Sequence, residues 1–267
     1  MMTFFNYFVF FIFGTIFGSF INVVVFRYNT GRSFVSGRSK CLSCGKMLHW
    51  YENIPLFSFL FLGGKCLGCG SKISYQYPLV EFATGALFCG LFFVFGFSEN
   101  LPFYFLMTIL LVIMSVYDLR HKIIPNGMVF LFDALAFIFL ISTHGISGIF
   151  SGAGLYDLLS GPILFSFFGF FWLVSRGTWM GLGDAKLALG VGWVLGFSGG
   201  IFAIIMAFWI GAAWSIFMLI LQNVHMSKSG LTLKSEIPFA PFIILGLYIQ
   251  LFTSWNFLTI INALIIR

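Results

Sequence analysis

The chain has 267 residues, of which 60% are hydrophobic and only 8% are charged, and its mean hydropathy is +1.03. Ordinary globular proteins carry roughly 25% charged residues to cover a surface that faces water, so this composition excludes a soluble domain. The formal charge of +6 does not indicate nucleic acid, because the basic residues form clusters between apolar stretches, as in the loops of membrane proteins. We therefore expect an all-α polytopic membrane protein with lipid, and no nucleic acid, around it.

Apolar runs set the expected number of membrane crossings, since each crossing needs about 20 mostly apolar residues in a helix. The first run lacks a basic segment before it and is too long for the core of a signal peptide, so we interpret it as a retained span. The pattern predicts about eight transmembrane helices. They lie near residues 4–26, 79–97, 102–117, 128–143, 158–175, 185–197, 200–221 and 238–266.

The placement of basic residues predicts the orientation. If the N-terminus lies outside, the segments 27–78, 118–127, 176–184 and 222–237 face the cytoplasm, and with their edges they hold every Lys and Arg except Arg267. An excess of basic residues in cytoplasmic loops is the usual pattern. The outward connectors are short.

Glycines in the sixth and seventh predicted spans are expected to let helices approach closely. They are Gly190, Gly192, Gly196 and Gly211.

Two CxxC pairs mark the one expected extramembrane domain, residues 27–78, between the first span (1–26) and a membrane domain at 79–267. About 50 residues form too small a core to be stable by apolar burial alone. Pairs separated by 21 residues are close to zinc-ribbon spacing, and Gly45 and Gly70 permit a tight turn after each pair. We predict a structural zinc site, and the alternative is that these thiols are redox-active or free. The fifth cysteine, Cys89, is expected to pack within a span. The predicted ligands are Cys41, Cys44, Cys66 and Cys69.

Two of the eight acidic residues are predicted at the cytoplasmic edge of the membrane: Asp118 closes the third span, and Asp184 ends the GLGD segment. Two carboxyls in a partly dry site can divide the roles of acid and base, as aspartyl proteases require. Gly181 and Gly183 would allow an extended substrate to approach. The alternative is that Asp118 pairs with a nearby basic residue and that Asp184 only caps a helix.

The other acidic residues have simpler expected roles. Asp133 is expected to be a polar contact between helices, and Glu81 opens the second span beside the cysteine domain. The remaining four are expected to be solvated in connectors and loops; they are Glu52, Glu99, Asp157 and Glu236.

Several segments together resemble the bacterial prepilin peptidases, the type IV leader peptidase family of bifunctional membrane aspartyl proteases. GSFINVVVFR at 18–27 resembles the exit of the family's first span, and CLSCGK with residues 53–81 resembles its cytoplasmic domain. DLRHKIIPN at 118–126 and GLGDAKL at 181–187 resemble its two catalytic segments, and IPFAPF at 237–242 resembles a late segment near the active site. The resemblance implies that Asp118 and Asp184 are the catalytic pair.

The resemblance also implies the substrates and the compartment. Such enzymes, in the bacterial inner membrane, cut the leader of type IV prepilins and type II secretion pseudopilins at the cytoplasmic face. Members with the cysteine domain also methylate the new N-terminal amine with S-adenosylmethionine, whose binding residues the sequence does not identify. The alternatives are a peptidase whose zinc domain only binds substrate, and a non-catalytic transporter or membrane scaffold.

Overall fold

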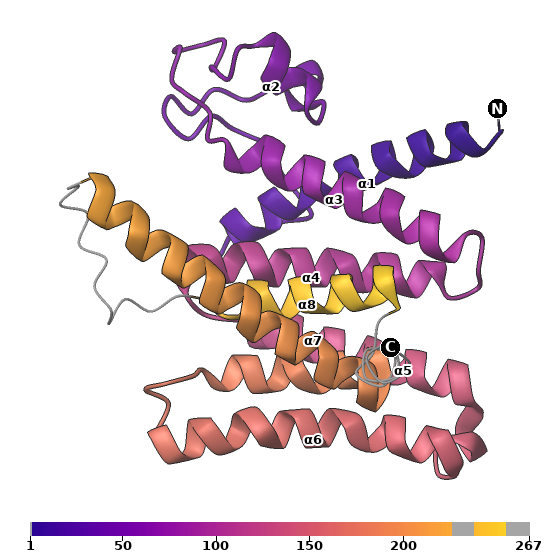
Figure 1. The fold of residues 1–267 in the computed structure, drawn as a ribbon. Helices are drawn as coiled ribbons and strands as arrows, with labels where there is room; N and C mark the ends of the chain where they lie inside the picture. Colours follow the sequence, from indigo (N-terminus) through magenta and orange to yellow (C-terminus); the bar gives the residue numbers. More distant parts are fainter. Residues whose placement is uncertain (1, 226–237, 255–267) are drawn as a thin grey trace. The chain divides into compact units, whose positions relative to one another are not determined.

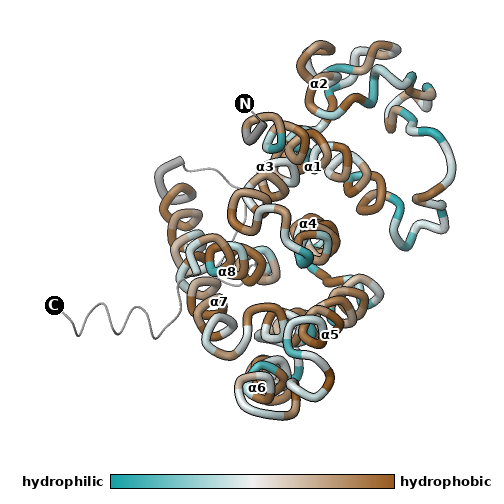
Figure 2. The backbone as a smooth tube through the Cα atoms, turned by 90° about the vertical axis from the view of Figure 1, so that its right-hand side faces the viewer, coloured by the Kyte–Doolittle hydropathy of each residue, from teal (hydrophilic) through white to brown (hydrophobic). Residues whose placement is uncertain are grey.

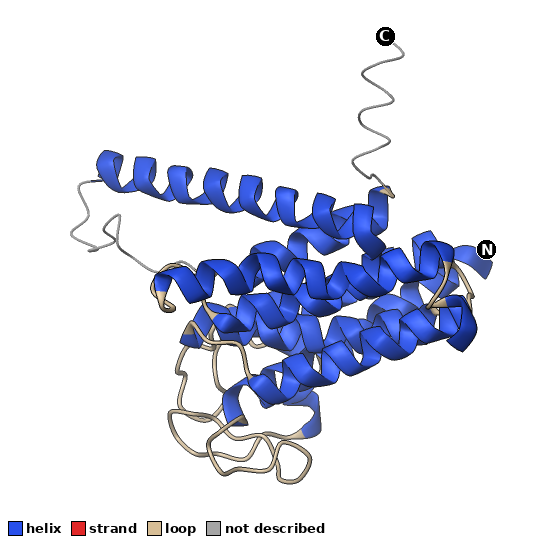
Figure 3. Ribbon diagram, turned by 90° about the horizontal axis from the view of Figure 1, so that it is seen from below, coloured by secondary structure: helices blue, strands red, loops and turns tan. Residues whose placement is uncertain are grey.

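The computed structural model describes residues 2–225 and 238–254. These residues are mostly helical and contain no β-strand, only two isolated bridges, with a long stretch of loops between α1 and α3 (Figure 3). The helices are α1 (Met2–Arg27), the short 3-10 helix η1 (Trp50–Asn53), α2 (Phe57–Phe61), α3 (Gln76–Phe95), α4 (Leu101–His121), α5 (Asn126–Gly148), α6 (Gly152–Ser175), α7 (Leu182–His225) and α8 (Ala240–Thr253).

Six of the described helices are long and apolar enough to cross a membrane, namely α1, α3, α4, α5, α6 and α7. Apolar residues dominate these helices, and polar residues gather in the connections and around α2 (Figure 2). The predicted all-α polytopic membrane fold is therefore confirmed. The predicted last span begins with the shorter apolar helix α8, and its residues beyond 254 lie outside the described part of the chain, as does Glu236.

Helix α7 contains two of the predicted spans, 185–197 and 200–221, joined without a loop. Its backbone leaves the helical conformation at Gly196, with φ 69° and ψ −178°, a positive φ that favours glycine. Gly192 and Gly200 would be about 12 Å apart along a straight helix. A Cβ on Gly200 would instead lie 3.5 Å from the Cα of Gly192. The chain thus turns back at Gly196, and α7 has two arms (Figure 1).

Residues 1–116 form one compact unit in which α1 packs along α3. Glycines let the two backbones approach: a Cβ on Gly14 would lie 2.8 Å from the Cα of Gly85, and one on Gly18 would lie 2.6 Å from the Cα of Glu81. The stretch between Arg27 and Gln76 forms the cysteine lobe, which this helix pair carries.

Residues 117–267 form the second unit, in which α7 contacts α5, α6 and α8. The contact with α6 is close because a Cβ on Gly192 would lie 2.8 Å from the Cα of Gly161. The hydroxyl of Ser160 donates a hydrogen bond of 2.7 Å to the carbonyl of Gly192. The predicted role of Gly192 in close helix approach is confirmed, whereas Gly196 serves the reversal instead.

Candidate functional site

Asp118 lies in the last turn of α4, with only 5% of its surface exposed. The third span was expected to end at residue 117, but the helix continues for four more residues. The carbonyl of Asp118 accepts a hydrogen bond of 2.7 Å from the N–H of Lys122, which ends the helix in a left-handed conformation at φ 56°. The carboxyl group of Asp118 is therefore fixed by a helix, not by a loop.

Asp184 lies in the first turn of α7, with 8% of its surface exposed. Its carboxylate faces Gly181, where an added Cβ would lie 3.6 Å from Oδ2, which is the place of a capping side chain at the start of a helix. The preceding glycine has a packing role: a Cβ on Gly183 would lie 2.9 Å from the Cβ of Ile124. The segment that follows Asp118 thus packs directly against the residue before Asp184.

The two aspartates come together within the second unit. They lie near enough for charge on Asp118 to act on Asp184. The carboxylate of Asp118 also lies near the backbone N–H of Ala240, the first residue of α8. The IPFAPF segment is described from residue 238 onward, and its Ala240 places it beside Asp118. Ile237 lies outside the described residues. Among the described residues, neither Asp118 nor Asp184 forms an ion pair.

Two nearby polar residues contribute to helix packing. Asp133 on α5 lies against Gly190 on α7, as expected of a residue between helices, but its buried Oδ1 has no hydrogen-bond partner in the described part of the chain. The ammonium group of Lys186 donates a hydrogen bond of 2.8 Å to the side chain of Asn126 and lies 5.0 Å from the ring centroid of Phe130. Lys186 therefore points to α5, and no ion pair joins it to Asp184 in the described part of the chain.

Of the acidic residues expected to be solvated, Glu52 is buried, and Asp157 is half-buried with partners on other helices. Glu52 is 7% exposed and forms an ion pair of 3.1 Å with Lys46. Asp157 was placed in a connector, but it lies within α6, 3.1 Å from the ring of His144 on α5. Its other oxygen accepts a hydrogen bond of 3.4 Å from the N–H of Phe197, just after the reversal of α7. Sequence reasoning missed these partners, because those of Glu52 depend on a turn of the lobe and those of Asp157 on how the helices meet.

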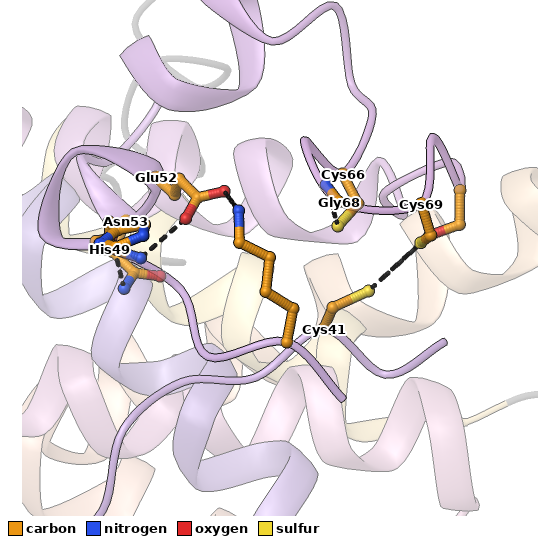
Figure 4. Close-up of polar contacts among 9 residues, drawn as sticks. Cys41, His49, Glu52, Asn53, Cys66, Gly68 and Cys69 are labelled. Atoms are coloured by element: carbon orange, nitrogen blue, oxygen red, sulfur yellow. Dashed lines mark hydrogen bonds and ion pairs between the residues drawn. The ribbon is translucent and has the colours of Figure 1, made fainter. Parts of the chain in front are cut away.

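The four predicted metal ligands meet in the cysteine lobe, with their sulfur atoms all within 4.8 Å of one another. In a tetrahedral zinc site with Zn–S bonds near 2.3 Å, neighbouring sulfurs lie about 3.8 Å apart. The Sγ atoms of Cys41 and Cys69 are 3.9 Å apart (Figure 4). The donor set and its spacing therefore fit zinc. Cys89 lies apart from the cluster, in α3.

The two cysteine pairs have the same local structure. The N–H of Gly45 donates to the carbonyl of Cys41 at 3.0 Å, and the N–H of Gly70 donates to that of Cys66 at 2.9 Å. Both glycines have positive φ, at 72° and 69°, so the predicted tight turns are confirmed. Each turn thus directs two thiols towards the cluster.

The thiols of the cluster also differ in acidity. Hydrogen bonds from the backbone N–H groups of Cys44 and Ser43 lower the pKa of Cys41 to about 6. The N–H of Lys46 favours the Cys44 thiolate, but the other three cysteines together with desolvation outweigh it and raise the pKa of Cys44 to about 11. Hydrogen bonds from Ser71 also lower the pKa of Cys69, so Cys41 and Cys69 form thiolates more readily than Cys44.

Beside this cluster, the buried Glu52 organises the chain between the two cysteine pairs (Figure 4). The N–H of His49 donates a hydrogen bond of 2.7 Å to its carboxylate, and Lys46 donates another of 3.1 Å. These contacts, first that of His49 and then that of Lys46, hold the pKa of Glu52 below its usual value near 4.5. Glu52 therefore stabilises the fold of the lobe as a carboxylate.

A second buried acid joins the lobe to α3. Glu81 is 7% exposed, and its carboxylate accepts a hydrogen bond of 2.8 Å from the N–H of Leu56. Leu56 has a φ of 61°, which is unusual for a residue with a branched side chain, and it precedes α2. The sequence placed Glu81 beside the cysteine domain, but it did not indicate this partner.

Comparisons with known proteins show which family the chain resembles. A family model described as the bacterial peptidase A24 N-terminal domain matches residues 12–95, and one described as the type IV leader peptidase family matches residues 105–216. Relatives named prepilin leader peptidase/N-methyltransferase include one from Pseudomonas aeruginosa, 33% identical over 89% of this chain and 87% of its own length. One from Bacillus subtilis is 34% identical over 89% of this chain and 90% of its own. Another, from Myxococcus xanthus, is 46% identical over 44% of this chain and 35% of its own length. No solved structure matches the chain.

Proposed function

Since this chain belongs to the type IV leader peptidase family, we propose that it cleaves the leader peptides of type IV prepilins or pseudopilins with Asp118 and Asp184 as its catalytic pair. The observation that carries the proposal is the meeting of these two buried carboxyls, from segments 66 residues apart, without a basic partner among the described residues. Buried acids that lack an ion partner are costly, and in a membrane protein they mark functional sites.

The reaction follows from the difficulty of ionising both acids at once. When two carboxyls share a partly dry site, one holds a proton and the other is charged. The charged carboxylate takes a proton from a water molecule, whose oxygen attacks the carbonyl carbon of the scissile peptide bond. The protonated carboxyl then donates its proton to the departing amine. The backbone N–H groups of Gly181, near Asp184, and of Ala240, near Asp118, would help to orient the two carboxyls for these steps.

The second proposed activity is methylation of the amine that cleavage exposes. The N-methyltransferase in the names of the relatives supports it, and the family resemblance implies S-adenosylmethionine as the methyl donor. S-adenosylmethionine would supply an activated methyl group to the uncharged form of this amine. We assign this activity to the cysteine lobe and the peptidase activity to residues 79–267.

Zinc held by Cys41, Cys44, Cys66 and Cys69 would have a structural role in this lobe. Four thiolates complete the usual coordination of zinc and leave no position for a substrate. Binding would supply folding free energy that a lobe of this size lacks. The reacting groups of both proposed activities would therefore lie outside the zinc site.

We further propose that the chain lies in the bacterial inner membrane with its N-terminus outside. This orientation follows the basic residues, and it brings the cysteine lobe and the end of α4 to the cytoplasmic face. A prepilin, with a basic leader followed by an apolar helix, would then present its cleavage site at the level of the acid pair.

The test uses purified full-length protein in detergent, a prepilin and labelled S-adenosylmethionine. Asp118→Asn and Asp184→Asn should each abolish leader removal, while methyl transfer to a pilin that has already been cleaved persists. Retained methyl transfer shows that the variants are folded. Normal cleavage by either variant would refute the catalytic pair. If the unaltered protein cleaves prepilin but transfers no methyl group, the chain is a peptidase only. If it shows neither activity on several prepilins, it is a non-catalytic membrane protein.

A further inference from the structure

The short helix α2 presents an apolar face that nothing in the described chain covers. Phe57, Leu60 and Phe61 are 50%, 73% and 86% exposed. Their spacing of three and four residues places them on one side of the helix. Residues 53–64 contain no charged side chain at all. An aqueous loop rarely exposes such a cluster, because apolar area in contact with water is unfavourable.

The orientation of this face is fixed by the opposite side of α2. The ring of Phe59 contacts that of Tyr75, with centroids 5.6 Å apart, and it lies beside Gly64, where an added Cβ would be 3.0 Å away. The N–H of Leu56 is held by the carboxylate of Glu81. The helix is thus attached to α3 on one side and exposes its apolar side outward.

The attachment to Glu81 also gives α2 a depth relative to the membrane. Glu81 is five residues into α3, a distance of about 7.5 Å along the helix axis. Helix α3 is apolar enough to span a membrane, and Figure 1 shows α2 beside its first turns. Tyr75, 79% exposed just before α3, is of the type that gathers at the interface between membrane and water. Helices that lie in this interface are buried by about 5–10 Å.

The charge of the lobe complements a negatively charged membrane surface. Glu52 is the one acidic residue between positions 28 and 75, and Lys46 pairs with it. Lys65 and Lys72 face each other across an isolated bridge, both exposed, after α2 in the chain. Other basic residues of this stretch are Arg32, Arg38 and Lys40. Clusters of basic residues next to a span are attracted to anionic lipids.

We propose that Phe57, Leu60 and Phe61 insert into the headgroup region of the leaflet beside the cysteine lobe, and that anionic lipids strengthen this contact. The short helix thereby fixes the height of the lobe at the membrane surface. This inference depends on α1 and α3 spanning a membrane, and it is independent of prepilin cleavage.

The test introduces the photo-crosslinker p-benzoylphenylalanine into the full chain, held in nanodiscs of phosphatidylethanolamine and phosphatidylglycerol. The label replaces Phe61 in one variant, where it substitutes one aromatic ring for another, and Leu60 in a second. Ser58 is the matched control, because it lies on the same helix but off the exposed face. After irradiation, mass spectrometry measures the fraction of chain that carries the added mass of a lipid.

We expect several-fold more lipid adduct at positions 60 and 61 than at position 58, and a lower yield in nanodiscs of phosphatidylcholine alone. Equal yields at the three positions, or no lipid adduct at positions 60 and 61, would overturn the proposal. If added prepilin is crosslinked there in place of lipid, the face is a substrate-binding surface and the proposal is also overturned. Because the lipid measurement needs no prepilin, an inactive protein would still give the expected result.

Discussion

Replacement of Gly183 by alanine tests how the acid pair is held together. The added Cβ would lie 2.9 Å from the Cβ of Ile124, where ordinary contacts begin near 3.4 Å. A Cβ atom cannot rotate away, so the backbone on one side must move by about 0.5 Å. Overpacking of this kind costs about 1–3 kcal/mol of stability. Gly181→Ala is the matched control, because its Cβ would meet Asp184 at an ordinary 3.6 Å.

The shift produced by Gly183→Ala falls on the residue that precedes Asp184, and Ile124 is six residues after Asp118. Catalytic groups must be held within about 0.5 Å of their working geometry, and an error of about 1 Å can cost about a hundredfold in rate. We therefore expect a loss of roughly tenfold to a hundredfold in kcat/KM for prepilin cleavage, together with the loss of stability.

The assay combines thermal unfolding in detergent with leader removal at several prepilin concentrations, for both glycine variants. Gly183→Ala should unfold at a lower temperature than the unaltered protein, and Gly181→Ala at the same temperature. Equal stability of the two variants, or normal cleavage by Gly183→Ala, would show that the packing of Ile124 does not position the acids.

Three further predictions concern the cysteine lobe. Cys41→Ser should lower the zinc measured by elemental analysis from about one per chain, whereas Cys89→Ser, in a span, should retain it; unchanged zinc in the first variant would contradict the ligand set. Glu81→Ala leaves the N–H of Leu56 without its acceptor, which costs about 1–3 kcal/mol. Amide hydrogen exchange at residues 56–61 should therefore accelerate, and unchanged exchange would exclude the anchoring role. Folding lowers the pKa of Glu52 below its usual value near 4.5. The Glu52 carboxylate therefore stabilises the fold at a pH above 4.5, and this stabilisation is lost as the pH falls through the pKa of the folded state. Glu52→Gln should thus reduce stability at neutral pH and matter little in strong acid, and an equal effect at both would contradict this.

Much of the site could be predicted from short motifs because local chemistry specifies it. The CxxC pairs need only two tight turns to direct four thiols together, and the glycine after each pair supplies the positive φ. Composition likewise predicted the helices, since an apolar run of about 20 residues in lipid has to satisfy its own backbone hydrogen bonds.

The features that sequence reasoning missed depend on backbone conformation or on contacts between segments, neither of which a residue type alone specifies. Gly196 was expected to aid helix packing, but whether a glycine packs or reverses the chain depends on the conformation of its neighbours. Glu52 was expected to be solvated, and its burial follows from a turn that brings the N–H of His49 to its carboxylate. Asp157 meets His144 because α5 and α6 are antiparallel neighbours, which no local pattern records.

The most direct test of the account is a double-mutant cycle on the acid pair. The measured quantity is kcat/KM for prepilin cleavage by Asp118→Asn, by Asp184→Asn and by the protein with both changes. Residues that act as one unit are strongly non-additive, so the double variant should be no slower than the slower single variant. If the free-energy losses of the two single variants sum to the loss of the double variant, Asp118 and Asp184 act independently. That result would contradict the shared mechanism.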